Sequence, residues 1–313
     1  MSATLVCNSL TNSSTNTLPI VTWLQQNQGR GVVLTSDCLS RNDFHLWNLD
    51  AQSRPKKDIS IVICTYGRSQ SLNDTLISLS HQTFKSFEVI LITEKGHLAR
   101  LRDKGLRHAL SPIVSFIDDD VCCPTTWLES IYKVFKEKGV VGVTGPTTII
   151  QEFQENRDCL KYKKLRKLQE WIFAVSSKPG LLSVCGAPSM GSNFGGCSYQ
   201  GEVDYLECCN MSVKKKEALD VGGFDHEYVQ TGEWSEPDLS LKLKTRGKLY
   251  FRTSCGLYHR PSKQGVYASR LSTEHRWENF KRFQRTWIKP SLRRHLYWGF
   301  VWGYLRMKSW RMI

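Results

Sequence analysis

The stretch Val114-Ser-Phe-Ile-Asp-Asp-Asp120 joins a short apolar run to three consecutive carboxylates. An apolar run of this length predicts a buried β-strand. Asp118 and Asp120 then follow the carboxyl end of that strand, where a parallel sheet binds its ligands. Two carboxylates one residue apart in a turn can aim at a common point, and hard oxygen ligands of this kind suit Mg²⁺ or Mn²⁺. The structural alternative is a solvated acidic turn, with one Asp capping a helix expected near Pro124.

The sequence on both sides of this stretch alternates short apolar runs with segments of helical periodicity. The expected strands are Ile59–Cys64, Phe87–Ile92, Val114–Ile117 and Val140–Val143, and the expected helices are Leu72–Ser80, Leu98–Ala109 and Thr125–Lys136. Apolar residues on consecutive positions, rather than on every second one, favour strands that are covered on both faces. We therefore predict an α/β fold with a mostly parallel central sheet flanked by helices.

The remainder of the chain is predicted in less detail. Residues 151–174 should be helical and basic, residues 175–203 a loop, Val213–Leu219 and Pro237–Arg246 short helices, and Leu249–Arg252 a strand. We divide the chain into an N-terminal accessory segment (1–57), a main domain (58–260) and a basic, aromatic, helical C-terminal extension (261–313). Pro290 should break the extension into two helices, because proline cannot continue the helical hydrogen bonding.

The charge of the chain is concentrated near its end. The 313 residues carry a net charge of +14, and the segment from Arg260 onward holds 13 Lys or Arg against two Glu. Such a segment suits an anionic partner, and donor phosphates, anionic lipid headgroups and nucleic acid all qualify. Its interleaved aromatic residues favour peripheral contact with an anionic membrane, although an aromatic stripe can also be core packing. Nucleic acid is disfavoured, because the acidic triplet repels phosphate unless a metal intervenes.

Neither a signal peptide nor a transmembrane helix is expected. Met1–Pro19 lacks a basic stretch followed by an apolar run. The apolar stretch Leu296–Leu305 has ten residues, about half of the roughly 20 that span a bilayer. We expect a cytoplasmic protein that attaches peripherally to the inner membrane face. Eleven cysteines in a chain without a secretion signal favour free thiols over a disulfide framework.

The run Asp58-Ile-Ser-Ile-Val-Ile-Cys-Thr-Tyr-Gly-Arg68 resembles the opening of the family 2 glycosyltransferases. The resemblance continues through residues 87–92, 98–106, 116–121 and 221–225, and covers roughly residues 58 to 260. It implies a GT-A fold and an inverting, metal-dependent transfer of a hexose. The donor would be a UDP-, GDP- or dTDP-linked sugar, and the acceptor a hydroxyl of a glycan or a lipid-linked molecule, as in polysaccharide biosynthesis.

The resemblance also assigns roles to individual residues. The Mn²⁺ or Mg²⁺ ligands would be Asp118, Asp120 and His259, and the nucleotide would contact Thr65, Tyr66, Arg68, Glu94, Arg102 and Asp119. Two positions depart from the family pattern. Gly67 stands where the family usually has Asn, and Glu94 lies where an Asp-rich turn usually contacts the nucleoside.

A second acidic cluster, Glu233-Trp-Ser-Glu-Pro-Asp-Leu239, resembles the family segment that bears the catalytic base. Glu236 occupies the base position, and Asp238 the position of the Asp at the start of the helix. Glu236 replaces the usual Asp, which lengthens the reach of the carboxylate by one methylene. The structural alternative is a helix start with Ser235 as N-cap and Asp238 as its partner in the first turn.

Three other functions remain open from the sequence. A metal-dependent nucleotidyltransferase also places carboxylates at strand ends, but it releases pyrophosphate. A nucleic-acid-binding protein would use the basic C-terminal extension and show steep salt dependence. A degenerate transferase would bind glycan without catalysis.

Overall fold

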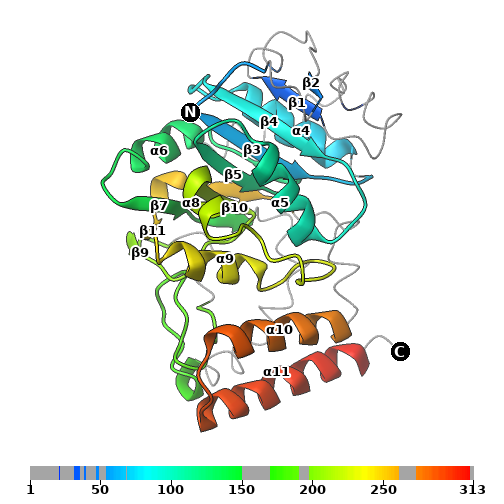
Figure 1. Cartoon of the computed structure of the whole chain (residues 1–313), viewed down its shortest axis with the longest axis vertical. Coiled ribbons are helices and arrows are strands. Elements are labelled where there is room, and N and C mark those ends of the chain that lie inside the picture. Colours follow the sequence, from blue (N-terminus) through cyan, green and yellow to red (C-terminus); the bar gives the residue numbers. More distant parts are fainter. Residues whose placement is uncertain are drawn as a thin grey trace.

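The computed structural model describes residues 21, 32–35, 39, 47–48, 54–67, 69–149, 170–189, 197–260 and 273–310. A large sheet lies across the upper part of the molecule, with helices on both of its faces (Figure 1). Below the sheet, the antiparallel helices α10 and α11 form a hairpin, and α9 lies between this hairpin and the sheet. The α/β class predicted from the sequence is confirmed.

The central sheet of the described residues has the strand order β2-β1-β4-β3-β5-β10-β7-β11-β9. The strands are β1 (Val32–Thr35), β2 (Trp47–Asn48), β3 (Ile59–Cys64), β4 (Phe87–Ile92), β5 (Ile113–Ile117), β7 (Val140–Thr144), β9 (Gly201–Glu202), β10 (Asn210–Lys214) and β11 (Lys248–Phe251). Strands β4, β3, β5, β7 and β11 run in one direction, whereas β1, β10 and β9 run against them. The sheet is therefore mixed, although most of its long strands share one direction.

Strand β10 corrects the prediction of a helix from Val213. The chain is extended over Asn210–Lys214, and α8 begins only at Lys215 and ends at Asp220. Met211 and Val213 are buried on one face of the sheet, while the hydroxyl of Ser212 lies 2.7 Å from that of Ser115 on β5. Five residues of alternating pattern do not distinguish strand from helix, and pairing with β5 and β7 decides between them.

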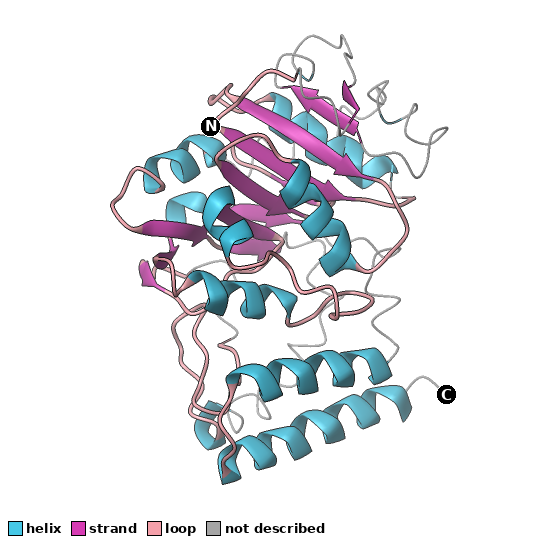
Figure 2. Cartoon of the chain, in the orientation of Figure 1, coloured by secondary structure: helices cyan, strands magenta, loops and turns pink. Residues whose placement is uncertain are grey.

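Helices cover the sheet on both sides, as Figure 2 shows. Helices α4 (Ser69–Ser80) and α6 (Trp127–Val134) contribute to one apolar cluster, and α5 (Leu98–His108), α8 and α9 (Ser235–Leu243) contribute to the other. In β3, Ile61 belongs to the first cluster and the adjacent Val62 to the second. This burial on both faces explains the continuous apolar run in the sequence.

A second, three-stranded sheet has the order β6-β12-β8 and lies at the end of β5. Its strands are β6 (Val121–Cys122), β8 (Thr147–Ile149) and β12 (Leu257–His259), and the short 3-10 helix η3 (Thr253–Cys255) precedes β12. Strand β6 begins directly after Asp120. The small sheet therefore connects the acidic triplet to a segment about 140 residues further along the chain.

The C-terminal hairpin consists of α10 (Thr273–Trp287) and α11 (Leu292–Trp310), with Pro290 between them as predicted. Phe280 of α10 and Tyr297 of α11 are buried together with Phe173 and Cys185, in a cluster separate from the two clusters of the sheet. Among the described residues, no helix combines the length and the apolar character that crossing a membrane requires.

The cysteines agree with the sequence prediction with one exception. Cys64, Cys123, Cys185, Cys197, Cys208, Cys209 and Cys255 are free, but Cys122 in β6 is disulfide-bonded. The expectation of free thiols therefore fails at Cys122, whose partner lies outside the described residues.

Two helical glycines provide a test of how α5 packs on β3. A Cβ at Gly105 would lie 2.3 Å from Cγ1 of Val62, whereas a Cβ at Gly299 in α11 would have no heavy atom within 4 Å. We expect Gly105→Ala to lower the free energy of unfolding by about 1–3 kcal/mol. Gly299→Ala should leave it unchanged or raise it by up to about 1 kcal/mol, because alanine is the better helix former.

Urea denaturation of both variants measures this difference. Equal unfolding midpoints would contradict the close approach of α5 to β3.

Candidate functional site

Asp118, Asp120 and His259 form a cluster of potential metal ligands. One ligand atom from each residue lies within 4.8 Å of the ligand atoms of the other two. His259 Nε2 is 2.9 Å from Asp120 Oδ1, and the side chain of Asp120 is only 6 % exposed. Two carboxylates and one imidazole at this spacing form a donor set that fits a divalent cation such as Mn²⁺.

The register of the small sheet brings these ligands together. His259 in β12 is paired with Val121 in β6, the residue that follows Asp120. The backbone N–H of Arg260 also donates to the carbonyl oxygen of Asp120 at 2.8 Å. The position of His259 beside the triplet thus results from antiparallel pairing between distant segments.

Asp119 has a different role from its two neighbours. Its side chain is buried, and Oδ2 accepts a hydrogen bond from Thr65 Oγ1 at 2.5 Å. This contact joins the turn after β5 to the turn after β3. Gly67 in the latter turn has φ +70°, a left-handed conformation that glycine adopts freely and that asparagine tolerates better than most residues. The departure at Gly67 therefore preserves the backbone geometry that the family's Asn can adopt.

Arg102 connects the acidic triplet to the second acidic cluster. Its Nη1 donates to Glu236 Oε1 at 2.8 Å, and its Nη2 lies 3.7 Å from Asp118 Oδ1. Burial alone would lower the pKa of this guanidinium, but the surrounding negative charge, including Glu236 and Asp118, outweighs burial and raises that pKa. Arg102 thus remains charged, and it contacts both ends of the candidate site.

Three free thiols, Cys64, Cys208 and Cys209, lie near the carboxylate of Asp118. Burial raises the pKa of the Cys64 thiol to about 12, and Arg102 offsets this only in part. Burial also raises the pKa values of the Cys208 and Cys209 thiols well above the usual range. These thiols are therefore protonated at neutral pH in the metal-free chain.

Glu236 lies in the first turn of α9, and the residues that precede this helix have an unusual backbone conformation. Gln230, Gly232 and Trp234 all have positive φ angles, of 55°, 64° and 76°. Positive φ costs energy in residues other than glycine, and it persists only where surrounding contacts hold the backbone. The predicted N-cap, Ser235, is instead the first residue of α9, and Trp234 occupies the cap position without a side-chain capping hydrogen bond.

Helix α10 supplies many of the contacts that hold the segment before α9. The ring of Trp234 lies 4.8 Å from that of Phe283 and 5.5 Å from that of Phe280, measured between centroids. Asn279 bonds the backbone of Val229 twice, at 3.0 and 3.1 Å, and Arg276 lies 3.0 Å from Glu233. The C-terminal hairpin therefore packs directly on the acidic cluster.

Asp238 contacts α10 and the next turn of α9. Its side chain is nearly fully buried, and Oδ1 accepts a hydrogen bond from the indole N–H of Trp287 on α10 at 2.7 Å. Its Oδ2 lies 2.6 Å from Lys242 Nζ, one turn further along α9. Asp238 therefore links α9 to the hairpin.

The remaining predicted nucleotide contacts are less tightly grouped. Tyr66 follows β3 and is half exposed, and Glu94 follows β4 and is paired with Lys104 of α5. Arg68 lies outside the described residues, as do residues 190–196, part of the segment predicted to be a loop. Thr65, Tyr66 and Glu94 follow neighbouring parallel strands, so they share one edge of the sheet.

Several residues that shape the site have no clear signal in the sequence. Trp287 and Arg276 belong to a basic, aromatic helix whose pattern indicates packing but not the partner. Arg260 next to His259 pairs with Asp74 of α4 at 3.3 Å. Lys104 lies one turn after Arg100 on α5 and pairs with Glu94. This pairing follows from the packing of α5 beside the end of β4, which the sequence does not indicate.

Comparisons with known proteins agree with this arrangement. Residues 92–175 match the sequence profile of the family described as Glycosyl transferase family 2. A relative in Haloferax volcanii, the glucosyl-dolichyl phosphate glucuronosyltransferase, is 21% identical over 209 residues, which cover 56% of this chain and 58% of the relative. This chain thus spans less than two thirds of the relative's length.

Two solved structures resemble the fold. GalNAc-T7 with UDP, GalNAc and Mn²⁺ matches 75% of this chain and 49% of its own, with a TM-score of 0.51 and 12% identity. S. aureus TarS 1–349 in complex with UDP-GlcNAc matches 75% of this chain and 68% of its own, with the same TM-score and identity. At such identity the likeness concerns the fold, and it confirms the GT-A architecture predicted from the sequence.

The cluster of Asp118, Asp120 and His259 predicts that Mn²⁺ binds in the absence of any substrate. At about 100 times its dissociation constant, a cation stabilises the folded chain by about 2.7 kcal/mol, which corresponds to roughly 5 °C in melting temperature. We expect Mn²⁺ to raise the melting temperature of the wild type by this order and to have no effect on Asp120→Asn.

Asp220→Asn is the matched control, because Asp220 lies on α8 and pairs with Lys216 at the surface. Differential scanning fluorimetry with and without EDTA gives the measurement. An equal Mn²⁺ shift in the wild type and Asp120→Asn would exclude a cation at this cluster.

Proposed function

We propose that this chain, which belongs to the family 2 glycosyltransferases, transfers a sugar from a nucleotide diphosphate donor to an acceptor hydroxyl with inversion at the anomeric carbon. The observation that supports this most directly is the position of Arg102. It contacts Asp118 of the metal-ligand cluster and Glu236 of the acidic segment at the same time. In the proposed reaction, the leaving-group site and the base site would therefore both adjoin this one guanidinium.

The leaving-group side would consist of Asp118, Asp120 and His259. A divalent cation, Mn²⁺ or Mg²⁺, would neutralise the charge that develops on the departing diphosphate. The nearby Arg102 stays protonated and adds a fixed positive charge in a buried position. Thr65 and Asp119 would fix the turn after β3, along which the nucleotide is expected to lie beside Tyr66 and Glu94.

The acceptor side would depend on Glu236 as general base. Its side chain is 19 % exposed, so its carboxylate is accessible from the site while Arg102 holds one oxygen in place. A base in this position takes the proton of the acceptor hydroxyl as the hydroxyl oxygen attacks the anomeric carbon. One direct displacement of this kind inverts the configuration of that carbon. We assign Asp238 a positioning role within the same segment, because its carboxylate is bound to Trp287 and Lys242.

The relatives suggest which substrates to test first. GalNAc-T7 was solved with UDP and TarS with UDP-GlcNAc, so UDP sugars are the first donors to test. The name of the Haloferax volcanii relative contains a dolichyl phosphate, which favours a lipid-linked acceptor over a free glycan.

Release of nucleoside diphosphate from a panel of UDP, GDP and dTDP sugars tests the reaction. We expect release from one donor with Mn²⁺ or Mg²⁺, and loss of release with chelator. Glu236→Gln should reduce turnover by about 10²–10⁴-fold, as expected for the loss of a general base, with little change in donor binding. Glu129→Gln, on the distant helix α6, is the control and should retain activity.

Pyrophosphate release from nucleoside triphosphates would instead identify a nucleotidyltransferase. Full transfer activity in Glu236→Gln would show that another group acts as base.

A second prediction concerns the support of the acidic segment by α10. Trp287→Phe keeps an aromatic ring but removes the N–H that binds Asp238. We expect kcat to fall roughly tenfold or more, because small displacements of a catalytic group are costly. KM for the donor should stay nearly constant, since the donor side of the site is not touched.

Trp298→Phe is the matched control, because it also removes an indole hydrogen bond within the hairpin, but to Gln284 at 3.2 Å. Steady-state kinetics and urea unfolding of both variants separate positioning from stability. If kcat fell equally in the two variants, in proportion to lost stability, the positioning role would be refuted.

A further inference from the structure

Exposed apolar side chains are unevenly distributed over the molecule. Within the described ranges, seven large hydrophobic residues are exposed, and six of them lie on the C-terminal hairpin or on the segment packed against it. These six are Trp171 (81 %), Leu292 (76 %), Val184 (73 %), Leu296 (54 %), Trp302 (48 %) and Ile172 (39 %). The seventh, Tyr66, belongs to the proposed nucleotide pocket. A concentration of this kind marks an interaction surface.

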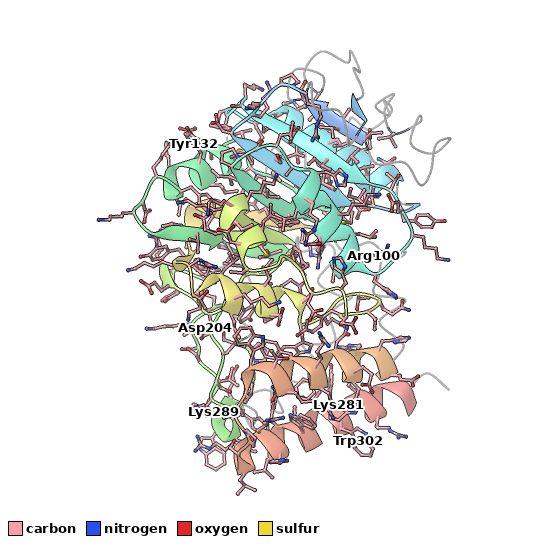
Figure 3. All side chains as sticks on the ribbon, in the orientation of Figure 1. Arg100, Tyr132, Asp204, Lys281, Lys289 and Trp302 are labelled. Atoms are coloured by element: carbon pink, nitrogen blue, oxygen red, sulfur yellow. The ribbon has the colours of Figure 1, made fainter. Side chains whose placement is uncertain are left out.

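Three of the six residues lie on one side of α11. Leu292 and Leu296 are one helical turn apart and Trp302 lies about 80° from Leu292 around the helix axis, while Tyr297 and Leu305 on the opposite side are buried. Trp302 projects from the side of α11 that faces away from α10 (Figure 3). Helix α11 is the outermost element at this end of the molecule. It therefore presents an exposed side on which these three apolar residues lie, with the Arg306 guanidinium 5.0 Å from the centroid of the Trp302 ring.

The other three residues, Trp171, Ile172 and Val184, belong to the segment that packs against α11. Phe173 packs against Tyr297 and Phe300 of α11, with ring centroids 5.0 and 5.5 Å apart, and it directly follows Trp171 and Ile172 in the chain. Cys185, next to Val184, is buried in the same cluster. We call the six exposed residues together the hairpin face.

The hairpin face is bordered by positive charge. Helix α11 contains no Asp or Glu, and Arg293 and Arg306 on it are exposed. Arg285 and Lys289, at the end of α10 and in the turn that follows, are exposed as well, and Lys289 is visible at the turn in Figure 3. Exposed Trp and Leu beside Arg and Lys form the composition of helices that lie in the headgroup region of an anionic bilayer.

We propose that the hairpin face docks on the surface of an anionic lipid bilayer. Trp302, Leu292 and Leu296 enter the headgroup region, and the basic residues around them bind lipid phosphates. A second copy of the chain fits this face less well, because a two-fold contact would place Arg293 and Arg306 of one copy near those of the other. The proposal extends the proposed function. It rests on that function in one respect: a lipid-linked acceptor gives the enzyme a reason to bind a membrane.

The inner side of the same hairpin holds the segment that contains Glu236. Arg282 binds Asp225 at 2.6 and 2.8 Å, in addition to the contacts of Arg276, Asn279 and Trp287. A bilayer bound to the outer side would therefore be connected to the proposed base through this pair of helices.

Flotation with lipid vesicles tests the proposal without any donor or acceptor. The full chain is mixed with vesicles of phosphatidylcholine alone, or of phosphatidylcholine with phosphatidylglycerol, at low and high salt. We expect binding to the anionic vesicles that weakens with salt, since surface charges are screened. Trp302→Ser and Leu296→Ser should each weaken binding roughly tenfold, as expected for removing one buried apolar side chain.

Charge reversal provides the matched comparison. Arg293→Glu should weaken binding about fivefold or more, given the contribution of one basic residue near an anionic surface. Lys138→Glu changes the net charge equally but lies after α6, on an exposed turn far from the hairpin, and it should bind almost as the wild type does. Melting temperatures of all four variants confirm that they fold.

The outcomes separate docking from catalysis. No flotation, equal flotation with neutral vesicles, or equal loss in Lys138→Glu and Arg293→Glu would overturn the docking proposal. So would a concentration-dependent dimer in gel filtration that Trp302→Ser abolishes. Donor cleavage in solution is measured separately, and its presence or absence bears only on the proposed function.

Discussion

The guanidinium of Arg102 lies between Glu236 on α9 and Asp118 after β5, and the two parts of the candidate site are connected through it. Arg102 is nearly fully buried, so its charge requires partners within the protein. Those partners come from segments more than 100 residues apart in the chain. Removal of either carboxylate would leave a buried charge poorly compensated, which links the geometry of the site to the stability of the fold.

The C-terminal hairpin connects the acidic segment 233–239 to the outer surface of the protein. Its inner side supports a backbone with three positive φ angles, two of them at residues other than glycine. Helix α10 contacts this segment at Val229, Glu233, Trp234 and Asp238, and the start of α5 holds Gln230 through His97 and Leu98. Basic residues on the inner side of the hairpin thus pair with acidic residues, and those on the outer side are exposed to solvent. A nucleic-acid-binding role is not needed to explain it.

Much of the central fold could be predicted because it depends on local patterns. The bounds of β3 and β4 agree with the sequence prediction to the residue, since both strands are buried on two faces and read as unbroken apolar runs. Strand β10 could not be predicted in this way. It lies between β5 and β7, and its five residues alternate Met211 and Val213 with polar neighbours, a pattern too short to define its period. The prediction of a free thiol at Cys122 was also wrong, because disulfide pairing depends on which distant segments of the chain meet in the fold.

The amino-acid sequence by itself determined which groups are available: the triplet Asp118–Asp120 at a strand end, Glu236 at a helix start, His259 after the last strand, and a basic aromatic tail. Each follows from composition or from the pattern of a short segment. The tertiary structure alone decided which of them meet. His259 lies beside Asp120 because β12 pairs with β6, Arg102 faces Glu236 because α5 and α9 cover the same side of the sheet, and Asp238 is directed to Trp287 because α10 packs on α9. Pairing and packing between distant segments depend on the whole folded chain, and no local pattern encodes them.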